Sequence, residues 1–285
     1  MKLFLIDGHA LVFKMYYAFL GRPMVNSKGE DTSIIFGFTK YLLELIHREQ
    51  PTHIAVSFDP PGGTFRNRLF PDYKANRSAT PQLVIDALEP LTRIVRSLDI
   101  PVLMVPDFEA DDVIGTMAKR FASAMDVYMV TPDKDYGQLI SSHIFQYKPG
   151  KGGADNEILG ESQVCEKYGI SSPSQVIDML AICGDSADNV PGVQGVGPVG
   201  ASRLLAKYDT LEGIYAHLND LTAKQQEAFR AAQDHIGLSK ELVTIKIDVP
   251  VEVELAELAL SKELDSQIIS LIEFYELRSL SKMVS

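Results

Sequence analysis

Short apolar runs alternate with longer stretches of helical periodicity over the first half of the chain. The short runs are bounded by Gly, Pro or Asp, which is typical of buried strands in a parallel sheet. They occupy residues 2–6, 54–58, 101–105, 126–130 and 143–147. Between them, apolar residues recur every three or four positions over residues 32–46, 83–98 and 110–125, as on one face of an amphipathic helix. This alternation predicts an α/β fold with a mainly parallel central sheet flanked by helices.

The pattern changes after residues 149–153, whose Pro, Gly and Lys residues predict a turn or flexible hairpin. Residues 161–217 have a helical pattern broken by a Gly-rich segment, and residues 249–258 alternate weakly. Residues 261–280 indicate one or two closing helices. We therefore expect three parts: an α/β core over 1–165, a helical subdomain over 166–250, and a C-terminal segment, 251–285, that packs back on the core.

The composition is that of a globular protein with a substantial core, since 46% of its 285 residues are hydrophobic. The apolar start resembles a secretory signal, but Asp7 and His9 interrupt it and no small-residue cleavage site follows. No uninterrupted apolar stretch is long enough to cross a bilayer. Cys165 and Cys183 cannot form a disulfide framework, and no Cys/His zinc spacing is present. These features predict a soluble, cytoplasmic protein with no membrane partner.

A net charge of −11 argues, by itself, against a nucleic-acid partner, because a polyanion usually meets a basic face. The acids are not scattered, however. They follow the first four predicted strands and recur in residues 183–189, and the carboxyl ends of parallel strands share one edge of a sheet. Carboxylates that converge there repel one another unless cations hold them. The candidate metal ligands are Asp7, Asp59, Glu109, Asp111, Asp112, Asp133, Asp135, Asp185 and Asp188.

Ligation by oxygen alone, without His or Cys, favours hard cations such as magnesium or manganese. Two adjacent divalent ions would suit displacement at phosphorus, where one activates water and both stabilise the attacking and leaving oxygens. A single strand-end acid has a plainer explanation as a helix N-cap, and Asp107 or Glu109 could cap the following helix. Acids after four strands and in a fifth loop favour the metal site.

A locally basic segment follows Asp59, between Pro60 and Pro81. Lys74 and Arg77 are three residues apart, so we expect them to share a helical face. The position of the segment directly after Asp59 favours contact with substrate phosphates, and a solvated loop is the alternative. Its cations, which outweigh Asp72, are Arg66, Arg68, Lys74 and Arg77.

Glycines recur over residues 192–200, and Gly195, Gly197 and Gly200 formally match the dinucleotide fingerprint. The context is wrong for that motif, because no strand precedes it and Pro198 lies inside it. A helix–turn–helix with exposed turn amides fits better, since such amides bind backbone phosphate at a helix N-terminus. A purely structural Gly-rich turn is the alternative.

Several short motifs occur in one fixed order along nearly the whole chain. They are Asp7-Gly8-His9, Phe58-Asp59, Phe65-Arg66, Tyr73-Lys74-Ala75-Asn76-Arg77, Glu109-Ala110-Asp111-Asp112, Asp133-Lys134-Asp135 with Gln138-Leu139, and residues 184–192. This ordered set resembles the 5′ nuclease (flap endonuclease) family, most closely the N-terminal 5′→3′ exonuclease domain of bacterial DNA polymerase I. The resemblance implies a PIN-like core with a basic helical arch at about 60–90. It also implies that residues 166–250 form a helix–hairpin–helix subdomain that grips duplex DNA.

The resemblance also assigns roles to residues. Asp7, Asp59, Glu109 and Asp111 would serve one metal ion. Asp112, Asp133, Asp135, Asp185 and Asp188 would serve the other, some of them through water. Lys74 would neutralise the scissile phosphate, with Arg77 and Arg66 steering the 5′ strand. The implied catalytic set is Lys74, Arg77, Asp7, Asp59, Asp111 and Asp185, and the implied DNA contacts are Arg66, Tyr73, Lys74, Arg77, Gly192, Gly195, Gly197, Gly200 and Arg203.

The expected function is a structure-specific 5′→3′ exonuclease or 5′-flap endonuclease, using two magnesium ions or manganese. Its partners would be branched or nicked duplex DNA and RNA primer–DNA, with potassium at the glycine hairpin. We expect a monomer of bacterial type, associated with the nucleoid. Where the family commonly has Lys-Thr in the hairpin, this chain has Val199-Gly200, which removes a phosphate-seeking charge.

Three other functions compete with this one. A haloacid-type phosphoryl transferase would need an Asp two residues after Asp7, where this chain has His9. A non-catalytic DNA-binding module would lack some of the acids, and none is missing. A metal-dependent hydrolase acting on RNA or small phosphoesters stays open.

Overall fold

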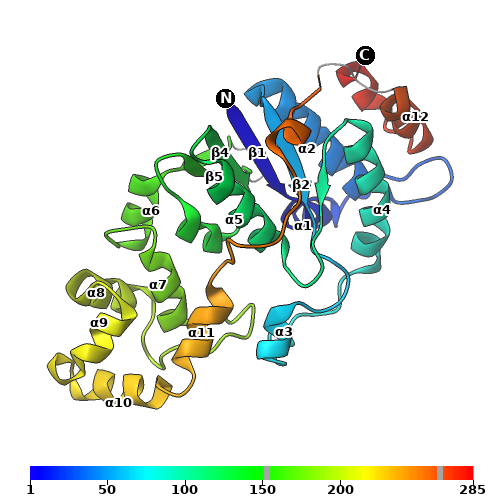
Figure 1. Ribbon diagram of the computed structural model, residues 1–285. Coiled ribbons are helices and arrows are strands. Elements are labelled where there is room, and N and C mark those ends of the chain that lie inside the picture. The colour runs from blue at the N-terminus through cyan, green and yellow to red at the C-terminus, as the bar shows by residue number, and fades with distance from the viewer. Residues whose placement is uncertain (151–154, 262–265, 285) are drawn as a thin grey trace.

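The computed structural model describes residues 1–150, 155–261 and 266–284. Its centre is a six-stranded sheet in the order β3-β2-β1-β4-β5-β6 (Figure 1). The first five strands are parallel to one another, and β6 pairs antiparallel with β5. This confirms the predicted mainly parallel sheet. The strands are β1 (Lys2–Asp7), β2 (His53–Ser57), β3 (Val102–Leu103), β4 (Asp126–Val130), β5 (Ile144–Lys148) and β6 (Glu157–Leu159).

Helices cover both faces of the sheet because its central strands are apolar on both sides. In β1, Leu3 and Leu5 belong to one buried cluster, whereas Phe4 and Ile6 belong to the other. The first face carries α5 (Ala110–Phe121) and α6 (Glu161–Tyr168). The second carries α1 (Gly8–Phe19), α2 (Ser33–Glu49) and α4 (Gln82–Ser97). The helical patterns at 32–46, 83–98 and 110–125 are thus confirmed, although α5 ends at Phe121.

Some elements differ from the sequence-based prediction. Helix α1 was not predicted; it begins directly after β1, where the Asp7 carboxylate accepts a hydrogen bond from Ala10 N at 2.9 Å. Strand β3 has only two residues, because Pro101 and a turn from Pro106 bound it. The weakly alternating residues 249–258 hold no strand, only the 3-10 helix η3 (Leu255–Leu258). The predicted turn at 149–153 lies partly outside the described residues.

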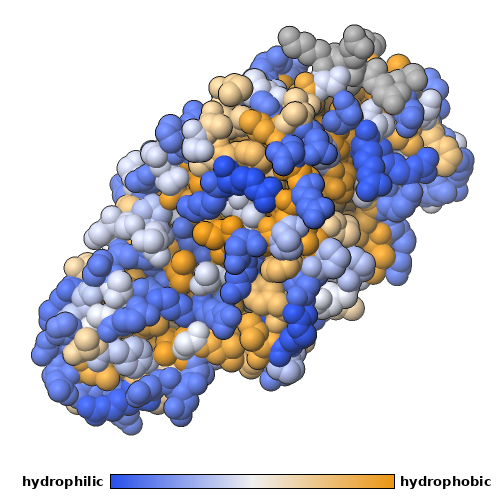
Figure 2. All heavy atoms as spheres, viewed as in Figure 1, coloured by the Kyte–Doolittle hydropathy of each residue, from blue (hydrophilic) through white to orange (hydrophobic). Residues whose placement is uncertain are grey.

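A helical subdomain extends from the core and lies at the lower left of Figure 1. Its first helix, α7, packs against both α8 and α11, and residues such as Ile182, Leu204 and Phe229 join the same buried cluster as one face of the sheet. Hydrophilic residues cover most of this subdomain in the view of Figure 2, whereas apolar residues gather over the middle of the molecule. The helices are α7 (Gln175–Cys183), α8 (Pro198–Tyr208), α9 (Leu211–Ala216), the 3-10 helix η2 (Leu218–Asp220), α10 (Ala223–Ala232) and α11 (Ile236–Val243).

After the subdomain the chain returns to the core. Leu260 N donates to Thr52 O at 3.0 Å, which brings the chain to the start of β2. Helix α12 (Ser266–Phe274) then packs on α4 through Ile268 and Ile272, and the 3-10 helix η4 (Arg278–Met283) follows. Among the residues that the structure describes, none of the helices has the length and apolar character needed to cross a membrane.

Gly192 is required by packing where the loop after α7 returns to the end of that helix. A Cβ at Gly192 would lie 2.5 Å from the carbonyl carbon of Cys183 and even nearer to Gly184 N, and backbone atoms cannot move aside cheaply. We predict that Gly192→Ala lowers the free energy of unfolding by about 2 kcal/mol, as overpacking does. Gly237→Ala in α11 is the control, since its Cβ would meet nothing within 4 Å and should raise stability by about 1 kcal/mol. Urea unfolding measures both; equal values for the two variants would contradict the packing requirement.

Candidate active site

Eight carboxylates from distant segments line one cavity of about 180 Å³ at the edge where β1, β2 and β4 end. The parallel strands deliver the first acids to this edge, the N-terminus of α5 adds two, and the loop after α7 adds two more. His9, Lys74 and Arg77 line the same cavity. The eight are Asp7, Asp59, Glu109, Asp111, Asp133, Asp135, Asp185 and Asp188, which leaves out only Asp112 of the predicted acids.

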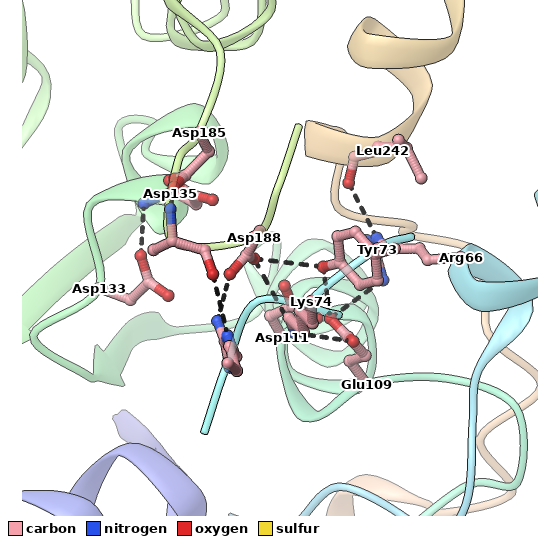
Figure 3. A network of polar contacts seen from close by, with 12 residues as sticks. Arg66, Tyr73, Lys74, Glu109, Asp111, Asp133, Asp135, Asp185, Asp188 and Leu242 are labelled. Atoms are coloured by element: carbon pink, nitrogen blue, oxygen red, sulfur yellow. Dashed lines mark hydrogen bonds and ion pairs between the residues drawn. The ribbon is translucent and has the colours of Figure 1, made fainter. Parts of the chain in front are cut away.

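The acids labelled in Figure 3 lie in two groups, with Asp188 between them. Asp133, Asp135 and Asp185 lie on one side, and Glu109 and Asp111 lie on the other beside Lys74 and Tyr73. The 3-10 helix η1 (Lys134–Leu139) begins at Asp133, whose Oδ1 accepts from Asp135 N at 3.0 Å.

Two of the strand-end acids also act as helix caps, as the plainer explanation proposed. Asp7 caps α1 with one oxygen, and its other oxygen accepts from Thr131 Oγ1 and Tyr136 Oη, both at 3.1 Å. Asp59 Oδ1 accepts from Ala110 N, at the start of α5, at 2.7 Å. Capping therefore holds these carboxylates at the cavity wall, and it is compatible with their predicted role as metal ligands.

Burial and mutual repulsion disfavour the charged forms of several acids. Burial raises the pKa of Asp7 to about 7, with Asp59 and Asp133 adding to the shift. Burial, then the charge of Asp133, raises the pKa of Asp135 to about 8. The pKa values of Asp111 and Asp133 are raised as well, chiefly by burial. Such shifts mark a site that would gain from positive charge.

Three cations meet this charge, two from the basic segment and one from the segment after β4. Lys74 Nζ donates to Glu109 Oε1 at 2.8 Å, and Arg77 pairs with Asp188. Lys134 Nζ lies 2.8 Å from Asp185 Oδ2. Burial alone would raise the pKa of Asp185, but the hydrogen bond and charge of Lys134 outweigh it and the pKa is lowered. Lys134 was not predicted as a site residue, although its position between two predicted metal ligands, Asp133 and Asp135, indicated that it lies near the acids.

The basic segment is a series of turns, which corrects the expected helical face for Lys74 and Arg77. The short helix α3 (Phe65–Leu69) stops before Pro71, and Lys74 has a left-handed backbone with φ of 60°. Backbone bonds replace the helix: Lys74 N donates to Asp188 O at 2.9 Å, and Arg77 N donates to Lys74 O at 3.1 Å. The turns thus fasten both cations to the loop that carries Asp188.

Arg66 borders the cavity from a buried position, whereas Asp112 lies outside the lining. Arg66 is only 1% exposed and Asp112 is 0% exposed, and the two side chains form a bidentate pair at 2.7 and 2.8 Å. The structure therefore contradicts DNA contact by Arg66 and metal ligation by Asp112, because the polar atoms of each are taken up by the other and by backbone groups. Tyr73 is 4% exposed, and its hydroxyl donates to Glu109 Oε2 at 3.2 Å. Tyr73 thus lines the cavity, but its burial leaves it little surface for a DNA strand.

The glycine hairpin forms the turn before α8. Gly195 has a positive φ of 75° and Gly197 precedes Pro198 at the start of the helix; a Cβ at either glycine would meet nothing within 4 Å. Arg203 is exposed on the same helix. The hairpin thus presents open backbone beside a cation, whereas Gly192 is explained by its packing against Gly184. DNA contact by Gly195, Gly197, Gly200 and Arg203 stays a prediction.

Two family models match adjacent parts of this chain. The 5′-3′ exonuclease N-terminal resolvase-like domain matches residues 2–169, and the 5′-3′ exonuclease C-terminal SAM fold matches residues 171–266. The chain belongs to the 5′-3′ exonuclease family. The acidic cavity lies between the two matched regions, since Asp185 and Asp188 come from the second.

Relatives of two lengths share this family. The chain is 33% identical to a 5′-3′ exonuclease of Aquifex aeolicus, over 99% of this chain and 94% of that protein. It is 35% identical to DNA polymerase I of Bacillus caldotenax over 100% of its own length, but spans only 32% of that protein. A solved complex of the bacteriophage T5 D15 flap endonuclease with DNA and metal ions has the same fold. Its TM-score is 0.72 at 15% identity, covering 99% of this chain and 100% of that one.

The donor atoms of the acidic cavity suit hard divalent cations. Asp135 Oδ1 is buried and, within the described residues, has no hydrogen-bond partner. Carboxylate oxygens are the ligands that magnesium and manganese prefer. Among those residues, however, no three acidic, His or Cys side chains are arranged around one point. Lys74, Arg77 and Lys134 already pair with acids, so ligation requires these side chains to move.

Replacing Asp135 by Asn tests the electrostatic cost of the cavity. An ordinary Asp pKa of 3.8 in the unfolded chain, against about 8 when folded, means that the folded state binds more protons between these values. Stability conferred at this position therefore falls as pH rises through that interval. In chelator, we predict that Asp135→Asn raises Tm above wild type, and that the gain grows from about pH 5 to about pH 8.

The control is Asp234→Asn, at an exposed position in the helical subdomain. This variant should show no comparable trend of Tm with pH. If the gain in Tm of Asp135→Asn stayed constant or shrank with pH, the buried charge of Asp135 would not destabilise the metal-free fold.

Proposed function

We propose that this protein is a structure-specific 5′→3′ exonuclease and 5′-flap endonuclease. It would hydrolyse phosphodiesters near the 5′ end of branched or nicked DNA, using two metal ions. One observation carries the proposal: eight carboxylates and three cations from the basic segment, Arg66, Lys74 and Arg77, line the same cavity. Family membership supports the reaction class, and the T5 flap endonuclease complex with DNA supports the substrate class.

The residues divide into metal ligands and phosphate contacts. Asp7, Asp59, Glu109 and Asp111 would hold one ion, and Asp133, Asp135, Asp185 and Asp188 the other, some through water. When bound, the ions would activate water and stabilise the attacking and leaving oxygens. Magnesium is the proposed ion, with manganese as a substitute, because both accept oxygen ligands.

Lys74 and Arg77 are the groups that would meet the scissile phosphate. Lys74 has 25% of its side chain exposed and Arg77 has 52%, so both can turn from their acids toward an incoming strand. A guanidinium binds phosphate through paired hydrogen bonds, whereas an ammonium acts as a point charge. Lys74 would therefore neutralise the phosphate, and Arg77 would orient the 5′ strand.

The glycine hairpin is the proposed grip on duplex DNA. Open amides at Gly195 and Gly197 would bind backbone phosphate at the start of α8, with Arg203 nearby and a potassium ion at the turn. RNA primer–DNA is a further proposed substrate, in replication and repair. We propose a monomer acting in the bacterial cytoplasm at the nucleoid, alone or as the N-terminal part of a DNA polymerase I.

Cleavage of a labelled 5′-flap duplex tests the two-metal proposal. Wild-type protein should cleave with magnesium and not with chelator, and Asp185→Asn should lose about 100-fold or more in rate because a ligand carboxylate is removed. Asp126→Asn is the control, since Asp126 begins β4 at the opposite edge of the sheet. Cleavage that ignores chelation, or an unaffected Asp185→Asn variant, would overturn the metal mechanism. Preference for an all-RNA substrate would favour the RNA-directed alternative.

Lys74→Ala separates chemistry from binding. Loss of a charge that acts on the transition state should lower the single-turnover rate by about 10²–10³-fold, while flap affinity changes by no more than about threefold. Fluorescence anisotropy in chelator measures the affinity. Lys282→Ala, an exposed lysine near the C-terminus, should leave both values unchanged. Equal losses of rate and affinity would make Lys74 a simple phosphate anchor.

A further inference from the structure

Arg66 is a buried arginine whose guanidinium finds an acceptor in every direction. Its Nε donates to Leu242 O at 2.9 Å, and Nη2 donates to Thr244 O at 3.0 Å and Asp112 Oδ1 at 2.8 Å. Its Nη1 donates to Asp112 Oδ2 at 2.7 Å and lies 3.5 Å from Glu109 Oε2. The planar fork of donors is thereby satisfied, which a lysine could not reproduce.

Asp112 is equally saturated from the other side. Its Oδ2 also accepts from Glu109 N at 3.1 Å, and its Oδ1 accepts from Lys246 N at 2.8 Å. The pair therefore connects three parts of the chain that are far apart in sequence. These are α3, which precedes the basic turns in the sequence, the N-terminus of α5, and residues 242–246, where the chain leaves the last helix of the helical subdomain.

Stability alone does not explain such a pair. Burying two charges costs desolvation that their attraction only partly recovers, and apolar residues of similar volume are often as stable or better. A bidentate pair does fix geometry, because its atoms fit in only one arrangement. Its position suggests what that geometry serves. Glu109 Oε1 accepts from Lys74 Nζ at 2.8 Å, and Glu109 Oε2 accepts from Tyr73 Oη at 3.2 Å and faces Arg66.

We infer that Arg66 and Asp112 form a positioning pair that sets Glu109 and Lys74 in the catalytic cavity and holds them in register with the helical subdomain. The inference rests on the proposed function. Neither side chain touches the substrate. A looser pair would let Glu109 and the turn that carries Lys74 shift relative to the acids of the strand ends, and displacements near 1 Å are costly for catalysis.

The test uses Arg66→Lys, Asp112→Asn and the double variant Arg66→Met/Asp112→Leu in the full chain. Each is assayed for Tm, for flap affinity in chelator, and for the single-turnover cleavage rate with magnesium. Arg66→Lys should lower the rate by about 100-fold and change the affinity by less than about threefold. The double variant should regain most of the Tm lost by Asp112→Asn, because apolar residues replace both charges, without regaining the rate.

Arg120→Lys is the matched control. Arg120 also fastens the returning chain to α5, through Val251 O at 2.8 Å and Val253 O at 3.3 Å, but it is exposed and lies outside the cavity lining. It should keep the wild-type rate.

Three results would overturn the inference. Rate and Tm that recover together in the double variant would make the pair a packing element. A loss confined to affinity in Arg66→Lys would make Arg66 a DNA contact, and an unchanged rate in that variant would leave the pair without a catalytic role. In all three, cleavage by wild type and Arg120→Lys keeps the proposed function intact. A wild-type chain that does not cleave would instead overturn the proposed function, and the inference with it.

Discussion

Repulsion between carboxylates at one sheet edge is the constraint on which the site depends. The parallel order of β2, β1 and β4 brings Asp7, Asp59 and the acids after β4 to the same edge. The cost is visible in the raised pKa values of Asp7 and Asp135. It is offset in part by cations from segments remote in sequence. The basic turns after α3 are thus held by the charge that they neutralise, together with the backbone bond between Lys74 and Asp188.

The same constraint joins the two matched regions of the family. Asp185 and Asp188 follow α7, which is the first helix of the helical subdomain and packs on α8 and α11. The cavity is therefore complete only when the helical subdomain is in place. A buried cluster that runs from the sheet to Phe229 packs this junction. Arg66 and Asp112 cross the junction at its polar side, beside Glu109. Apolar packing therefore holds the two parts together, whereas the buried ion pair selects their register.

The strands, the main helices and the acids could be predicted because each depends on a local pattern: a short apolar run followed by Asp, or apolar residues at helical spacing. The predictions that failed concern the direction in which a side chain points or the backbone turns. Asp111 and Asp112 are neighbours on α5 and point about 100° apart, so only Asp111 reaches the cavity. Arg66 looked like a free cation because its partners lie 43 and more residues away. The left-handed backbone of Lys74 carries no side-chain signal comparable to a glycine, so the turns around it were expected to be helix.

The acids whose charge argues against a DNA partner are paired with the cations that argue for one. Lys74 is held by Glu109, and Arg77 by Asp188, so neither is fully available to a phosphate while those acids lack another counter-charge. Lys134 stands in the same relation to Asp185. In the proposed mechanism, cations bound by the acids would release these side chains at the moment when the cavity loses its negative charge. Metal binding and the approach of a polyanion would then favour each other, because bound cations remove the repulsion between the acids and a phosphate and free Lys74 and Arg77 to bind it.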